Sequence, residues 1–244
     1  MDGMIVIGLI AAIAFLYAMV GHGGASGYLA LMAVIGFSPL VMKPTALLLN
    51  LCVSSIATVQ FARAGHFQWR MFWPFALTSV PMSFIGYGIG IEHDPRLYLQ
   101  LLGVCLLVAA ARMFGLFGQG AAGTKPAPIA IALTIGAGIG FVSGMLGIGG
   151  GILLSPLLLW CSWGNAKSAA AISAPFILVN STAGLVRASQ GAVFTGQETY
   201  VWVVAAVCGG LLGSWVGANK IIEPRLRQAL GLVLVLASIK LFFP

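Results

Sequence analysis

Apolar runs follow one another along this chain from end to end, with only short polar stretches between them. Most of these runs are roughly 17 to 22 residues long, the length that an α-helix needs to cross a hydrocarbon core of about 30 Å. No stretch between them is long and polar enough to form a soluble domain. The pattern therefore predicts an all-α polytopic membrane protein.

The apolar pattern also repeats itself in the two halves of the chain. The stretch LGVCLLVAAARMF (102–114) aligns without a gap on LGLVLVLASIKLF (230–242), and AMVGHGG (18–24) aligns on GMLGIGG (144–150). Such internal similarity indicates a tandem duplication. We assign a first repeat (1–116), a Gly/Pro-rich linker (117–128) and a second repeat (129–244).

Each half is predicted to begin with a helical hairpin broken by a cluster of glycines and to continue with three full spans. The segments of the first half are 4–20, 26–36, 44–62, 71–90 and 96–114. Those of the second half are 129–146, 152–163, 168–187, 198–218 and 226–243. The two arms of a hairpin total about 30 residues, roughly 22 Å per arm, which is too short for two crossings. The glycine clusters are therefore expected inside the membrane, near the midplane.

The basic residues favour one topology. If each hairpin returns to the side from which it entered, eight of the 12 Lys and Arg residues lie on one side and four on the other: Lys43, Arg96, Arg187 and Lys240. If each hairpin exits on the far side, the split is six against six. Because cytoplasmic loops carry an excess of Lys and Arg, the first arrangement is preferred, with both termini outside. The two repeats are then inverted relative to each other.

The composition agrees with a membrane protein, since 60% of the residues are hydrophobic and 7% are charged. The net charge of +7 reports topology in such a chain and does not indicate a nucleic-acid partner. The acidic residues all lie at segment ends or in loops: Asp2, Glu92, Asp94, Glu198 and Glu223. Because no carboxylate is expected at mid-membrane, a cation site and a carboxylate proton relay are disfavoured.

The two glycine clusters are the candidate substrate site. A broken helix leaves up to four N–H groups unpaired at the start of its second piece, together with about half a positive charge. Glycine lets these groups approach a ligand closely, so each cluster is expected to bind a small anion. The candidate residues are Gly21, His22, Gly23, Gly24 and Ser26 in the first cluster, and Gly147, Gly149, Gly150, Gly151 and Ser155 in the second.

Further polar side chains fall near the middle of the predicted segments. His22 is the only titratable one, and it either contacts the anion, carries a proton, or is held structurally within its hairpin. Asn50 and Asn180 are expected to face a cavity or a neighbouring helix, because a lipid-facing amide would be costly there. Ser54 and Ser173 are weaker candidates, since serine can hydrogen-bond to its own helix backbone.

Other small residues indicate packing and not chemistry. Five glycines, most of them four residues apart, are typical of close helix–helix contacts: Gly86, Gly90, Gly209, Gly213 and Gly217. The four cysteines lie singly within apolar runs, without metal-ligand spacing. No metal and no cofactor is therefore expected.

The stretches GMLGIGGGILLSPLLL (144–159) and GHGGASGYLALMAVIGF (21–37), each followed by an apolar helix that begins near a Lys, resemble the sulfite exporter TauE/SafE family. The likeness extends over the whole chain, including its length and duplication. It implies a bacterial inner-membrane protein that moves sulfite, sulfoacetate or related small anions, usually outward. By motif matching it assigns the substrate site to Gly21, Gly23, Gly24, Gly147, Gly149, Gly150, Gly151, Ser155 and Pro156.

The first half departs from this motif. It has His22 where the second half has Ile148, Ala25 where the second half has Gly151, and no proline in the place of Pro156. Strict symmetry between the two clusters is therefore not expected.

The leading hypothesis is a carrier that exports a small sulfur-containing anion through a midplane site, with the anion and the lipid bilayer as its partners. A channel or facilitator for other small anions, such as carboxylates, is the alternative. An enzyme is disfavoured because the chain has no GxSxG, no HExxH and no paired carboxylates. A purely structural subunit and a homodimeric assembly stay open.

Overall fold

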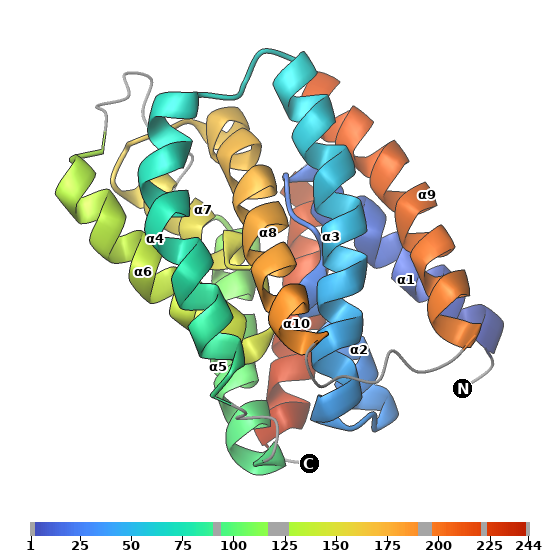
Figure 1. Cartoon of the computed structure of the whole chain (residues 1–244). Helices are drawn as coiled ribbons and strands as arrows, with labels where there is room; N and C mark the ends of the chain where they lie inside the picture. Colours follow the sequence, from blue (N-terminus) through green and yellow to red (C-terminus); the bar gives the residue numbers. More distant parts are fainter. Residues whose placement is uncertain (1–2, 90–93, 117–126, 190–196, 221–223, 243–244) are drawn as a thin grey trace.

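The computed structural model of the protein describes residues 3–89, 94–116, 127–189, 197–220 and 224–242. Within these ranges the chain forms ten α-helices and no β-strand, as the apolar pattern predicts (Figure 1). The helices of the first half are α1 (Gly3–Met19), α2 (Ala25–Ile35), α3 (Pro39–Arg63), α4 (Trp69–Tyr87) and α5 (Pro95–Met113). Those of the second half are α6 (Ile129–Leu146), α7 (Gly151–Trp160), α8 (Ala166–Ala188), α9 (Gln197–Asn219) and α10 (Pro224–Phe242). Most of the predicted linker, residues 117–126, lies outside the described residues.

Five described helices are long and apolar enough to cross a membrane, namely α3, α5, α6, α8 and α9 from Thr199 onward. Helices α4 and α10 were predicted as full spans and have 19 residues each, but they are not in this group. Arg70 and two prolines make α4 less apolar, and α10 carries three basic residues. The chain is nevertheless a multi-pass membrane protein by its five long apolar helices.

Both predicted hairpins are present as two helices separated by a break. The first arms, α1 and α6, have 17 and 18 residues, whereas the second arms, α2 and α7, have 11 and 10. At 1.5 Å per residue the arms are about 26 Å and about 16 Å long. They are therefore unequal, where the sequence suggested roughly 22 Å for each, because the glycines begin only after a nearly complete apolar run.

Helix α3 begins earlier than predicted, at Pro39 and not near residue 44. Proline is well tolerated in the first turn of a helix, where its missing N–H needs no partner. Pro44 lies inside α3 but still close to its start. The helix therefore gains more than one turn at the end that carries Lys43.

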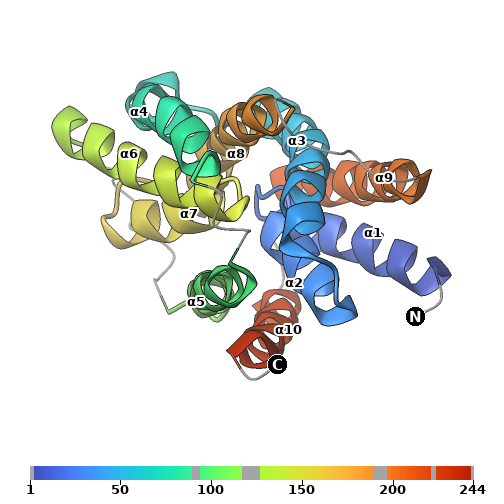
Figure 2. The ribbon, with the colours of Figure 1, turned by 60° about the horizontal axis from the view of Figure 1, so that its bottom comes forward.

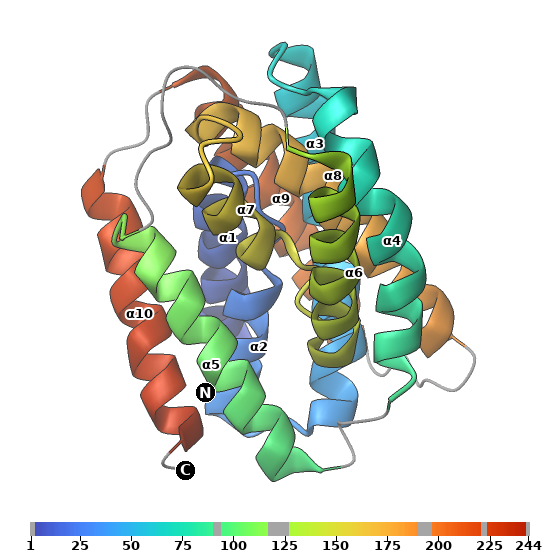
Figure 3. The same cartoon turned by 90° about the vertical axis from the view of Figure 1, so that its left-hand side faces the viewer.

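The helices of the two halves pack against each other in an exchanged pattern. Helix α1 packs against α9, and its counterpart α6 packs against α4, while α3 packs on α8 and α5 on α10 (Figure 2). The short helices α2 and α7 lie between these pairs: α2 contacts α3 and α10, and α7 contacts α8 and α5 (Figure 3). The two hairpin tips are therefore enclosed by helices from both halves.

Glycines make the closest of these contacts. On α9, Gly209, Gly213 and Gly217 lie so close to the α1 backbone that an added Cβ would collide with carbonyl groups there. This confirms their predicted packing role, and Gly86 lies equally close to the α6 backbone at Phe141. Gly90 is outside the described residues. The corresponding glycines of α6, which the sequence analysis did not single out, face α4: Gly136, Gly140 and Gly144.

Candidate functional site

The first helix break comprises residues 20–24 and joins α1 to α2. The N–H of His22 donates to the Tyr17 carbonyl at 2.9 Å and closes the end of α1. Gly21 and Gly24 have φ values of 73° and 95°, a left-handed conformation that residues with a Cβ rarely adopt. Gly24 is also the N-cap of α2, so the chain re-enters helix directly after it.

The second helix break comprises residues 147–150 and joins α6 to α7. Gly147, Gly149 and Gly150 have φ values of 77°, 74° and 77°. The N–H of Gly147 donates to the Ser143 carbonyl at 2.8 Å, and Gly150 is the N-cap of α7. Both glycine clusters of the sequence are thus real interruptions of helix, each ending at the N-terminus of a short helix.

Asn50, in the middle of α3, lies between the two breaks. Its side-chain oxygen accepts a hydrogen bond from the N–H of Ala25 at 3.2 Å, and its amide nitrogen donates to Ser181 Oγ on α8 at 3.0 Å. A Cβ at Gly23 would collide with the Asn50 side-chain oxygen, and a Cβ at Gly149 would collide with its nitrogen. The two glycine backbones therefore contact one amide, which links the breaks through α3.

His22 extends from the first break into the second hairpin. Its Nδ1 lies 2.9 Å from the Val20 carbonyl oxygen, and its Nε2 lies 3.1 Å from the Gly151 carbonyl oxygen and 3.2 Å from Ser155 Oγ. Ser155 Oγ is in turn 2.6 Å from Ser173 Oγ on α8. All three side chains are buried. The structure therefore brings these three predicted residues into one hydrogen-bonded chain that joins the hairpins.

The short helices α2 and α7 both start at this junction. The N–H groups in the first turn of a helix have no partner within it, and they carry the positive end of the helix dipole. At α2 the Asn50 side chain accepts from one of these groups, that of Ala25. At α7 the N-cap residue supplies no side-chain hydrogen bond. Two such ends, buried and close together, can bind a small anion through the backbone.

Three predicted residues have partners outside this junction. Ser54 Oγ donates to a carbonyl of its own helix at 3.3 Å, the local bond that makes serine a weak candidate. Ser26 Oγ donates to the Tyr17 hydroxyl at 2.8 Å. The amide nitrogen of Asn180 donates to a carbonyl one turn earlier on α8 at 2.8 Å, and its side-chain oxygen has no partner among the described residues.

Lys43 is a residue beside the second break that the sequence analysis placed at a membrane boundary. It is fully buried, with 0% of its surface exposed. Its Nζ donates to the Tyr87 carbonyl at 3.3 Å and lies 3.9 Å from the centre of the Tyr87 ring. A Cβ at Gly147 would approach the Lys43 side chain to 2.8 Å. The sequence signal was weak, namely that an apolar helix beginning near a Lys follows each glycine cluster.

Three hydroxyl residues at the breaks were also missed. Ser181 binds the Asn50 amide, and its only signal was its position next to Asn180. Tyr28 and Ser143 lie beside the N-cap glycines of α2 and α7. Nothing in the sequence distinguished them from other hydroxyl side chains in apolar helices.

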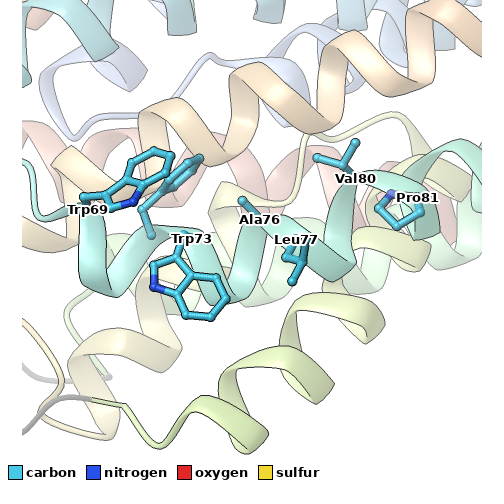
Figure 4. Close-up of a pocket in the computed structure, with 7 residues that line it drawn as sticks. Trp69, Trp73, Ala76, Leu77, Val80 and Pro81 are labelled. Atoms are coloured by element: carbon cyan, nitrogen blue, oxygen red, sulfur yellow. The ribbon is translucent and has the colours of Figure 1, made fainter.

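Two apolar grooves lie elsewhere on the molecule. One of about 580 Å³ follows α4 and is lined by Trp69, Phe72, Trp73, Ala76, Leu77, Val80 and Pro81 (Figure 4). The other, of about 520 Å³, lies between α1, α2 and α10, with Lys240 as its one charged residue. Apolar walls suit hydrocarbon and not an anion. Within the described part of the chain, no group of His, Cys, Asp and Glu could hold a metal ion.

Comparison with known proteins gives one family. The model of the family described as sulfite exporter TauE/SafE matches residues 4–241. The probable membrane transporter protein y4hK of Sinorhizobium fredii is 42% identical over 236 residues, covering 95% of this chain and 94% of that protein. A probable membrane transporter protein of Xylella fastidiosa is 28% identical over 200 residues, covering 74% of this chain and 71% of that protein. No solved structure matches the chain significantly.

Proposed function

Since this chain belongs to the sulfite exporter TauE/SafE family, we propose that it exports a small sulfur-containing anion, such as sulfite or sulfoacetate, across the bacterial inner membrane. The family makes it a membrane transporter and not an enzyme. The observation that carries the choice of an anion is the meeting of two helix N-termini, those of α2 and α7, around Asn50. Both ends present N–H groups and positive dipole ends to the same buried region.

The charges of the interior support an anion over a cation. The buried charged side chains among the described residues are Lys43 and Arg112, and both are basic. A membrane cation site normally uses acidic side chains or carbonyl groups, and a carboxylate proton relay needs a buried acid. Positive charge near the breaks instead lowers the cost of moving an anion into the low-dielectric interior.

The packing of the helices supports two inverted repeats, 1–116 and 129–244, joined by the linker 117–128. The contact of α1 with α9 has a counterpart in the contact of α6 with α4, in which the roles of the two halves are exchanged. Transporters built from inverted repeats move one repeat against the other around a fixed central site. Asn50 contacts glycines of both breaks, and His22 extends from the first break to the start of α7, which supports a central site between them.

Outward transport of the anion needs no coupling ion. A membrane potential of about 100 mV, negative inside, contributes roughly 2.3 kcal/mol per elementary charge, so a monovalent anion leaves the cytoplasm downhill. The start of α1 and the end of α10 lie toward the same end of the bundle in Figures 1 and 3, which supports placing both on one side of the membrane, and we assign that side to the outside. The excess of Lys and Arg on the opposite side agrees with that choice.

Counterflow tests this function. The purified protein is placed in vesicles loaded with unlabelled sulfite, and uptake of labelled sulfite is followed with sulfate, sulfoacetate, taurine and acetate as competitors. Saturable uptake that some competitors block is expected. A signal for acetate alone would keep an anion carrier and change its substrate, whereas absence of transport for every compound would contradict the proposal. A conductance far above carrier turnover would identify a channel.

A further inference from the structure

Two buried hydroxyl groups at the breaks have no hydrogen-bond partner among the described residues: Tyr28 Oη and Ser143 Oγ. Each residue has only 1% of its surface exposed. A buried donor without a partner is costly, so nearly all such groups in folded proteins have one. These two are therefore ready to donate to a group that the protein binds.

Tyr28 stands over the start of α2. Side chains on a helix lean toward its N-terminus, so Tyr28 leans back over the N-cap, Gly24, one turn earlier. A Cβ placed on Gly24 would lie 2.8 Å from the Tyr28 hydroxyl oxygen. The unpaired hydroxyl is therefore beside the first-turn N–H groups of α2.

Ser143 occupies the corresponding position at the second break. A Cβ placed on Gly150, the N-cap of α7, would lie 3.3 Å from the Cβ of Ser143. The carbonyl of Ser143 accepts from the N–H groups of Gly147 and Ile148, which fixes the residue at the edge of the break. Its hydroxyl thus lies beside the start of α7, as that of Tyr28 lies beside the start of α2.

The other polar side chains at the breaks already have partners. Asn50 uses both ends of its amide, on Ala25 and Ser181. His22 and Ser155 contact each other, and Ser26 binds Tyr17. Each of these side chains is already held by the protein, although the amide nitrogen of Asn50 keeps a second N–H. Hydrogen bonding therefore divides the site into groups that hold the breaks together and two hydroxyls that do not.

We propose that Tyr28 and Ser143 are the side-chain donors to the transported anion, one at each break, and that Asn50, His22 and Ser155 position the two helix N-termini. The inference rests on the proposed function. It also assigns the ligand a chemistry: an anion with several acceptor oxygens, as in sulfite or a sulfonate, so that different oxygens accept from the two hydroxyls and from the backbone N–H groups.

The test is equilibrium binding to the purified full-length protein, with Tyr28→Phe and Ser143→Ala as variants. Sulfite is titrated by calorimetry, and sulfate, sulfoacetate, taurine and acetate are compared. The Tm of each variant is measured with and without sulfite. The matched controls, Tyr98→Phe and Ser238→Ala, remove buried hydroxyls that have a partner within the protein. The Tyr98 hydroxyl donates to the Leu146 carbonyl at 2.9 Å, and the Ser238 hydroxyl donates to the Gly103 carbonyl at 2.9 Å.

Both variants are expected to bind sulfite at least about tenfold more weakly, as for a lost hydrogen bond to a charged group. Their ligand-free Tm should stay the same or rise, because a buried unpaired hydroxyl has been removed. The controls should lower Tm and keep the wild-type Kd. A purely structural role for Tyr28 or Ser143 would give the pattern of the controls instead.

The outcomes separate the two proposals. If the wild-type protein binds no anion of the series, the proposed function is wrong, and the wild-type titration alone shows it. If the wild type binds an anion and both variants bind it equally well, the function stands and the assignment of the hydroxyls is overturned. Weaker binding of the anion in one variant only would overturn the assignment of the hydroxyl at the other break.

Discussion

Gly150 has a φ of 77°, and an added Cβ there would lie 2.8 Å from Phe176, 3.1 Å from Ile139 and 3.3 Å from Ser143. Two separate constraints therefore exclude other residues, one from the backbone and one from packing. Gly36, after α2, has a φ of 91° but nothing within 4 Å of its added Cβ. Substituting each of these two glycines therefore separates the free-energy cost of the left-handed backbone conformation from the cost of placing a side chain inside the second break.

Gly150→Val is expected to abolish counterflow without preventing membrane insertion, because the valine side chain would push α6 and α8 away from the start of α7. Gly36→Val carries the same backbone strain, roughly 1–2 kcal/mol, outside the break. It should lower the Tm and keep transport. Transport by both variants at the wild-type rate would exclude the second break as part of the pathway.

His22→Ala removes the contacts with Gly151 and Ser155 that join the two hairpins. The loss should destabilise the protein by about 1–3 kcal/mol, measured by thermal unfolding in detergent. His66→Ala, in the loop before α4, is the control and should have little effect. If His22 also carries a proton, the dependence of sulfite transport on pH will differ between His22→Ala and wild type; an unchanged profile leaves it a purely positioning residue.

At the scale of elements, the hairpin arms are held by glycine-lined contacts with the other half of the chain. The α6 face made by Gly136, Gly140 and Gly144 lies directly on the α4 backbone. Gly138 is on the same helix but has nothing within 4 Å of its added Cβ. Without a hydrophobic driving force between helices in lipid, such close backbone contacts are what hold them together.

Gly140→Ala is therefore expected to destabilise the protein by about 1–3 kcal/mol, because its methyl group would collide with the Ser79 carbonyl on α4. Gly138→Ala should be neutral or stabilise by up to about 1 kcal/mol, the gain in helix propensity. Thermal unfolding of the two variants in the same detergent makes the comparison. Equal stability of the pair would contradict the close α4–α6 contact.

At the scale of the whole molecule, the two halves together form the hydrogen-bonded junction between the hairpins, where the proposed site lies. The first break contributes His22, and α7, directly after the second break, contributes the Gly151 carbonyl and Ser155. Asn50 comes from the first half and its partner Ser181 from the second. A change in the relative position of the halves would therefore rearrange the contacts of His22 with Gly151 and Ser155 and of Asn50 with Ser181, the kind of change that the proposed movement of one repeat against the other would produce.

If the anion is transported without a coupling ion, as proposed, its distribution across the membrane should depend on the membrane potential. With a potential of 100 mV set by a potassium gradient and valinomycin, a monovalent anion should reach a ratio of about 50-fold across the vesicle membrane, with the higher concentration on the positive side. Labelled anion at equilibrium gives the ratio, and protein-free vesicles are the control. A concentration ratio that does not change with the membrane potential would indicate electroneutral exchange or proton coupling.

The apolar run lengths and the internal repeat were enough to predict an all-α membrane protein with two glycine breaks, since helix length and glycine content are local properties. The resemblance to the family was based on the same two glycine clusters, and the family model matches residues 4–241. The segments were less accurate: α3 starts five residues before the predicted 44, and α4 ends at Tyr87 and not at residue 90. Helix ends depend on caps and on prolines in the first turn, which hydropathy does not detect.

Run length and glycine position, which the sequence carries by itself, thus determined that both helices break and that a short new helix follows each glycine cluster. Only the tertiary structure decided that the breaks meet at Asn50, that Lys43 is buried beside Gly147, and that Ser181 is the partner of Asn50. Asn50 and Ser181 are 131 residues apart in the chain, and Lys43 and Gly147 lie in different halves of it. Their meeting depends on how helices from the two halves pack, which no local pattern encodes.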